Sequence, residues 1–176
     1  PDLSAMPFRQ ILFLQLSALA ALHGRRLEDE AALLDATLSR ERDYWARCLE
    51  AEGFDRELLD GLAQAVAILT LINGTQSAKE AKEILTATPR LRHLAQPARD
   101  RLFDLLRRLY PRGSGIDALR PDLLGERLVR ACLAKDGEII EEVLDTNKHP
   151  DWIASTLTVL TRIAQHGERR WLEAAL

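Results

Sequence analysis

One stretch interrupts an otherwise helical pattern and constrains the fold more than any other part of the sequence. Residues 108–129 read Arg-Leu-Tyr-Pro-Arg-Gly-Ser-Gly-Ile-Asp-Ala-Leu-Arg-Pro-Asp-Leu-Leu-Gly-Glu-Arg-Leu-Val. An amphipathic helix is expected to end just before Pro111, because proline blocks its continuation. Gly113 and Gly115 allow the backbone to turn where other residues would be strained. The few residues that follow leave room only for a short β wing.

A second helix is expected directly after the wing. Arg120-Pro121-Asp122 has the composition of a helix start, since proline is tolerated in a first turn and an acid there complements the positive end of the helix dipole. In winged-helix units, a helix is followed by a wing that contains glycine and then by a helix that begins with an acidic residue. The stretch therefore predicts such a unit.

The rest of the chain indicates an all-α fold. Apolar residues recur at helical spacing, and runs of valine, isoleucine, threonine and tyrosine that favour strands are nearly absent. Ser77 and Glu80 have the spacing of a capping box, in which the two side chains satisfy the first free N–H groups of a helix. The pattern predicts helices over residues 7–23, 27–52, 55–72, 78–88, 98–110, 123–134, 137–144 and 150–165, with a short helical segment from residue 168.

These helices suggest three domains. Residues 1–53 are predicted to form a small helical bundle, and residues 54–121 a winged-helix-like domain with a minimal β wing. Residues 122–176 contain short helices joined by tight turns, which is typical of helical hairpins at the start of an α-solenoid or TPR-like region.

The composition restricts location and partners. No apolar run reaches the length of about 18 residues that suggests a membrane span, and no signal-peptide pattern is present. Cys48 and Cys132 lack metal-ligand spacing and are expected to be reduced thiols of a cytoplasmic protein. The net charge of −3 provides no global argument for nucleic-acid binding. The first residue is Pro1 rather than methionine, which suggests a piece of a longer chain.

No motif for catalysis is visible. The sequence contains no phosphate-binding glycine loop, no dinucleotide-binding glycine pattern and no zinc-binding histidine pair, and its four histidines are scattered. Nothing indicates a nucleophile next to its base. We therefore expect no catalytic residue, no metal site and no cofactor bound by this segment alone.

The helix over residues 98–110 could instead be a DNA-recognition helix. Arg99 and Arg101 on this helix, together with Arg112 of the wing, could bind phosphates and read guanine. Asp100 and Asp104 lie between the arginines, however, and this charge balance favours an ordinary solvated face.

The chain also resembles a known family along most of its length. A first apolar helix over residues 7–24 is followed by a charged helix with Arg40-Glu-Arg-Asp-Tyr-Trp45 and then by a three-helix unit. Leu109-Tyr-Pro and Leu119-Arg-Pro-Asp-Leu-Leu-Gly-Glu-Arg-Leu-Val129 come next. This order is similar to that of bacterial STAND NTPases, which are signal-transducing ATPases related to the NB-ARC and NACHT proteins. The similar region follows their ATPase core and comprises a helical domain, a winged helix and the start of a helical sensor.

The resemblance implies a regulatory role. In NB-ARC relatives the winged helix ends in Met-His-Asp-Leu, whose histidine contacts the β-phosphate of ADP in the closed state. Arg120-Pro121-Asp122-Leu123 occupies the matching place, so the resemblance implies nucleotide sensing by Arg120 and Asp122. Pro121 replaces the histidine and has no side chain that could bind phosphate. The implied partner is the protein's own nucleotide-binding domain, with ATP or ADP bound in the full-length protein.

Two alternatives remain open from the residues. A DNA-binding winged-helix regulator would use Arg99, Arg101 and Arg112 as a continuous basic face. A helical scaffold that binds another protein would instead have a concave apolar groove over residues 123–176 and would lack a wing.

Overall fold

The computed structural model describes residue 18, residues 30–144 and residues 150–165. The predicted helix over residues 7–23, apart from residue 18, and the predicted segment from residue 168 lie outside the described residues. The chain divides into two compact units, Pro1–Tyr44 and Trp45–Leu176. Apart from residue 18, the described part of the first unit is the beginning of helix α2 (Glu30–Ala51), on which Leu33, Leu34 and Leu38 are buried.

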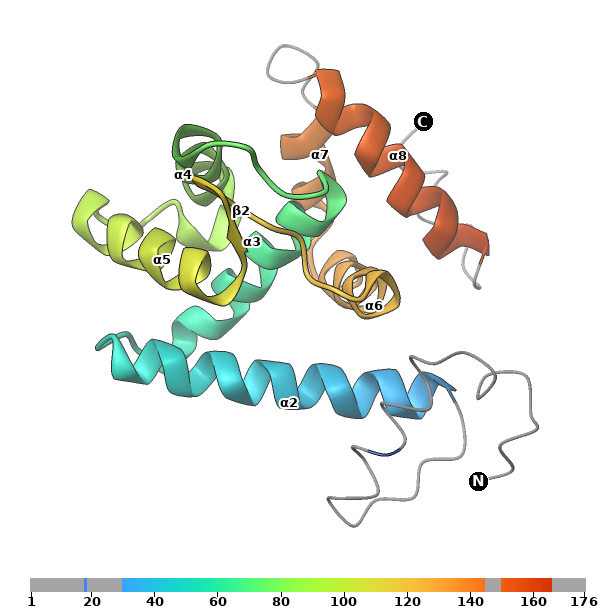
Figure 1. The fold of residues 1–176 in the computed structure, drawn as a ribbon, viewed down its shortest axis with the longest axis horizontal. Helices are drawn as coiled ribbons and strands as arrows, with labels where there is room; N and C mark the ends of the chain where they lie inside the picture. Colours follow the sequence, from blue (N-terminus) through green and yellow to red (C-terminus); the bar gives the residue numbers. More distant parts are fainter. Residues whose placement is uncertain (1–17, 19–29, 145–149, 166–176) are drawn as a thin grey trace. The chain divides into compact units, whose positions relative to one another are not determined.

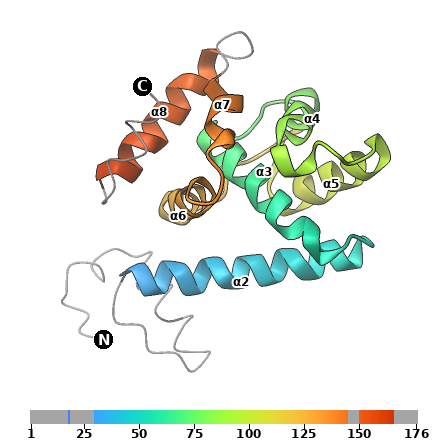
Figure 2. The same cartoon turned by 180° about the vertical axis from the view of Figure 1, so that it is seen from behind.

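The second unit is built around helix α3 (Leu59–Leu71). A 3-10 turn, η2 (Arg56–Leu58), precedes it where the sequence predicted the first turn of an α-helix. Every residue from Gly61 to Leu71 is buried. A helix that is apolar on nearly all sides needs neighbours on all sides. Figures 1 and 2 show α4 and α5 on one side of α3, and α6, α7 and α8 on the other.

The helices on the first side begin and end close to their predicted positions. Helix α4 (Ala78–Ala87) starts at Ser77, whose Oγ accepts a hydrogen bond of 3.2 Å from the backbone N–H of Glu80. The Glu80 carboxylate accepts from the N–H of Gln76 at 2.9 Å, one residue before the amide that the capping-box pattern predicted. A second 3-10 turn, η3 (Pro89–Leu91), leads to helix α5 (Gln96–Leu109).

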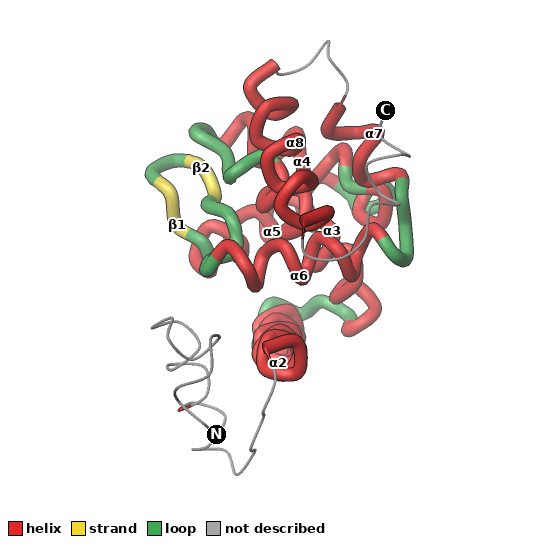
Figure 3. The backbone as a smooth tube through the Cα atoms, turned by 90° about the vertical axis from the view of Figure 1, so that its right-hand side faces the viewer, coloured by secondary structure: helices red, strands yellow, loops and turns green. Residues whose placement is uncertain are grey.

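The predicted wing is present as a minimal antiparallel hairpin. Strand β1 (Pro111–Arg112) pairs with strand β2 (Gly115–Ile116), with Pro111 opposite Ile116. Figure 3 shows the hairpin at one edge of the second unit. Thr75, between α3 and α4, extends the hairpin, because its N–H donates to the Ile116 carbonyl at 2.8 Å and its Oγ1 accepts from the Ile116 N–H at 3.0 Å. Gly115 is required there, since an added Cβ would collide with the Thr75 carbonyl.

Three further helices complete the second unit: α6 (Asp122–Leu133), α7 (Glu138–Leu144) and α8 (Pro150–Gln165). Helix α6 makes the most extensive contact with α3, and α8 packs against α3, α6 and α7. Gly125 permits the close approach of α6, because a Cβ at this position would lie 2.7 Å from Cγ2 of Thr70.

The all-α fold class with a minimal β wing is thus confirmed. The compact unit Trp45–Leu176 includes the three-helix unit, the wing and the helices that follow. The division into domains at residues 53/54 and 121/122 stays a prediction. None of the helices in the described residues combines the length and the apolar character that crossing a bilayer demands.

Candidate functional site

The C-terminal end of α3 is the structural centre of the candidate site. Asn73 has a left-handed backbone with φ of 61°, and Gly74 follows with φ of 77°. The Gly74 N–H donates to the Leu69 carbonyl at 2.7 Å and closes the helix end. Arg112 of the wing donates to the Asn73 carbonyl and pairs with Asp117 at 3.3 Å. The wing is therefore attached to the negative end of the α3 dipole by a cation.

Arg120 and Asp122 meet beside this helix end. Arg120 forms an ion pair with Asp122 through Nη1, and its Nη2 donates to the side-chain oxygen of Asn73 at 2.7 Å. Both charged side chains are about half exposed, 51% for Arg120 and 49% for Asp122. The structure thus brings together the two residues for which the resemblance implied nucleotide sensing.

Helix α8 contributes a third charge to this cluster. Arg162 places Nη1 3.1 Å from Oδ2 of Asp122 and 3.7 Å from Oε1 of Glu126. Asp122 therefore binds an arginine on each of its two oxygens. We call these five residues, Asn73, Arg120, Asp122, Glu126 and Arg162, the Asp122 network. It joins the end of α3, the start of α6 and the last turn of α8.

The Asp122 network lines a cavity of about 310 Å³. Two arginines face two carboxylates, so the formal charges of the lining cancel. The remaining lining is rich in amide and hydroxyl groups. The cavity is lined by Thr70, Asn73, Ala118, Leu119, Arg120, Asp122, Glu126, Ser155, Thr158, Val159 and Arg162. Such a set of donors and acceptors can bind a polar group.

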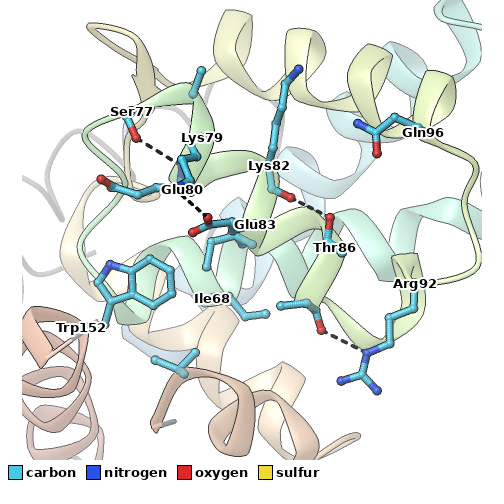
Figure 4. Close-up of a pocket in the computed structure, with 14 residues that line it drawn as sticks. Ile68, Ser77, Lys79, Glu80, Lys82, Glu83, Thr86, Arg92, Gln96 and Trp152 are labelled. Carbon is cyan, nitrogen blue, oxygen red and sulfur yellow. Dashed lines mark hydrogen bonds and ion pairs between the residues drawn. The ribbon is translucent and has the colours of Figure 1, made fainter. Parts of the chain in front are cut away.

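A larger concavity of about 1200 Å³ lies between α4 and the α7–α8 pair. Its floor is apolar and includes Ile68, Ile84, Val143 and Trp152, all buried. Figure 4 shows Trp152 and Ile68 below the charged side chains of α4. Those charges have partners: Lys79 lies 3.9 Å from Glu83, and Lys82 lies 2.8 Å from Asp100. The scaffold alternative expected a groove over residues 123–176 without a wing, whereas this groove is shared with α4 and the wing is present.

The three arginines of the nucleic-acid alternative contact acceptors within the chain. Arg99 donates to the Gln96 side chain at 3.2 Å. Arg101 donates to the Glu52 carbonyl at 3.0 Å and lies 4.7 Å from the centre of the Phe54 ring. Arg112 is bound to Asn73 and Asp117, as described above. Each guanidinium thus has at least one acceptor within the chain, and duplex binding stays a prediction.

Sequence reasoning did not identify Arg162, Asn73 or Glu126 as members of the site. Glu126 follows Asp122 by four residues and so shares its helix face, which is a signal that the sequence contains. Arg162 lies forty residues from Asp122 along the chain. No local pattern in the sequence predicts such a pair.

The described part of the chain contains no cluster of three histidine, cysteine or acidic side chains that could hold a metal ion. No protein-family model matches this sequence, and searches of curated proteins and of solved structures found no significant match.

Proposed function

We propose that this chain is a non-catalytic regulatory module of a STAND-type signal-transducing ATPase in the bacterial cytoplasm. The module would pack on the nucleotide-binding domain of the same protein. The assignment to this class rests on the resemblance of residues 109–129. One structural observation supports it most: Arg120 and Asp122 lie together, half exposed, at the junction of the wing and α6.

Arg120 is suited to contact a nucleotide bound by a neighbouring domain. A guanidinium offers several donors in a planar fork and keeps its charge at physiological pH, so it binds phosphate oxygens well. Pro121 lacks the phosphate contact that a histidine makes in relatives, and Arg120 would supply the charge instead. Asp122 and Asn73 hold the guanidinium in place without burying it.

Regulation would follow from competition between Asp122 and a nucleotide phosphate for the Arg120 guanidinium. With ADP present, a phosphate contact to Arg120 would favour the closed arrangement of module and nucleotide-binding domain. Exchange for ATP would change this contact and shift the population towards an open arrangement. The energy of a few charge-assisted hydrogen bonds is enough for a shift of this kind.

The first test is the sequence of the reading frame that precedes Pro1. We expect a phosphate-binding loop and a Walker B acid within the preceding few hundred residues. A preceding region without either would contradict the proposal.

The second test measures how long the full-length protein retains ADP. Arg120→Ala should accelerate ADP release by about tenfold or more, the loss expected for one hydrogen bond to a charged group. Arg107→Ala is the matched control, because this exposed arginine of α5 makes a single hydrogen bond among the described residues, a long one of 3.5 Å to the Gly113 carbonyl. Equal release rates for both variants would contradict a role of Arg120 in nucleotide sensing.

A further inference from the structure

The cavity beside the Asp122 network contains hydrogen-bond donors that the fold does not use. Arg162 contacts Asp122 and Glu126 through Nη1, and within the described residues its Nε and Nη2 have no partner. Asn73 uses its two oxygens as acceptors, which leaves its side-chain NH2 group free among those residues. The hydroxyl of Ser155 likewise has no partner in the part of the chain that the structure describes.

Other polar groups of the same cavity already have partners within the chain. Asp122 accepts from Arg120 on one oxygen and from Arg162 on the other. The Glu126 side chain is 10% exposed and lies 3.7 Å from Arg162. The Thr158 hydroxyl donates to the Ala154 carbonyl at 2.8 Å. The donors that remain unused at this cavity include part of the Arg162 guanidinium.

Unused donors of this kind favour an oxygen-bearing anion. Arginine, amide and hydroxyl donors stabilise phosphate and carboxylate groups through charge-assisted hydrogen bonds. A volume of about 310 Å³ accommodates a small ligand or the anionic end of a larger one.

We propose that this cavity is a binding site for a small oxyanion, a phosphate or a carboxylate group, held by Arg162, Ser155 and Asn73. None of these three residues is proposed to contact the nucleotide, Asn73 binds the anion through its NH2 group while its side-chain oxygen accepts from Arg120, and the site needs no other domain. Binding through Nε and Nη2 would leave the Nη1 contact of Arg162 with Asp122 in place. Glu126 would limit affinity, because its carboxylate repels the anion and attracts the same guanidinium.

The test is titration calorimetry of the chain with sodium phosphate and, separately, with sodium acetate. Ionic strength is held constant so that general screening does not change. We expect saturable binding that Arg162→Ala weakens by about tenfold or more, as for loss of a hydrogen bond to a charged group. Arg107→Ala should leave affinity unchanged, and Ser155→Ala should weaken binding without altering the charge.

Glu126→Gln gives the sharpest result, because it keeps the shape and removes the competing charge. We expect it to bind the anion more tightly than the unmodified chain, a gain that general damage to the fold would not produce. A higher affinity for phosphate than for acetate would identify a phosphoryl ligand. Acetate binding that is as tight as phosphate binding would identify a carboxylate ligand. Absence of saturable binding, or equal loss in Arg107→Ala and Arg162→Ala, would overturn the inference. If the protein binds phosphate but Arg120→Ala does not change its rate of ADP release, this inference stands and the proposed nucleotide switch is rejected.

Discussion

Helix α3 and the residues just beyond its C-terminus are stabilised by different forces. Along the helix, every residue from Gly61 to Leu71 is buried, and most are aliphatic. Just beyond its C-terminus, Asn73 connects to Arg120 and Asp122, whose side chains are about half exposed. Burial of apolar area is strong and insensitive to salt, whereas exposed ion pairs contribute little and are screened. The comparison indicates a rigid core beside an adjustable polar junction.

The largest expected effect is in the core. Leu62→Ala removes a fully buried side chain of α3, so it should lower the free energy of unfolding by about 2–5 kcal/mol. Urea denaturation of the chain measures this difference. A loss below about 1 kcal/mol would mean that the surrounding helices collapse into the space, and that the core is less rigid than the comparison states.

A smaller effect is expected where α6 meets α3. Gly125→Ala places a Cβ 2.7 Å from Cγ2 of Thr70 and 2.9 Å from the Leu119 carbonyl oxygen. Overpacking of this kind costs about 1–3 kcal/mol in urea denaturation. Gly137→Ala is the matched control, since no atom lies within 4 Å of its added Cβ. Equal stabilities of the two variants would show that α6 can move away from α3 at little cost.

The junction itself should contribute less. Arg162→Met removes the ion pair with Asp122 and should lower stability by less than about 1 kcal/mol at low salt. Above roughly 0.5 M salt the difference from the unmodified chain should vanish, because exposed charges are then screened. Thermal unfolding at both salt concentrations checks this. A difference that persists at high salt would assign Arg162 to the core rather than to the adjustable junction.

The smallest effect concerns pH and an exposed ion pair between α4 and α5. The hydrogen bond from Lys82 holds the pKa of the Asp100 carboxyl below its ordinary value of 3.8. A carboxyl whose pKa is lowered by folding contributes stability above its unfolded pKa and loses it as pH falls through the folded value. Lys82→Met should therefore be less stable than the unmodified chain at neutral pH, with a gap that closes below pH 3.8. A gap independent of pH would assign the effect to the contact of Lys82 with Phe103.

Much of the fold could be predicted from local features. Apolar spacing placed α3 to α8 within a few residues of their observed bounds, and Pro111, Gly113 and Gly115 indicated the wing. One detail of the predicted helices was wrong, at the start of the helix predicted over residues 55–72. Residues Arg56–Leu58, which were predicted as the first turn of an α-helix, form a 3-10 helix, whose hydrogen bonds are one residue tighter.

The candidate site was predicted only in part. Arg120 and Asp122 are two residues apart, so their proximity follows from the chain itself, and the resemblance suggested their role. Asn73 and Arg162 come from 47 and 40 residues away. Long-range partners of this kind depend on how α8 packs against α3 and α6.

By itself, the sequence determined the helical class, the wing and the acid-led start of α6, because these depend on apolar period, proline and glycine within a few residues. Only the tertiary structure decided that two arginines share Asp122, and that unused donors gather at one cavity. Charges lie on helix surfaces in many arrangements of similar local energy. Which of them meet is settled by the packing of apolar faces that lie elsewhere on the same helices.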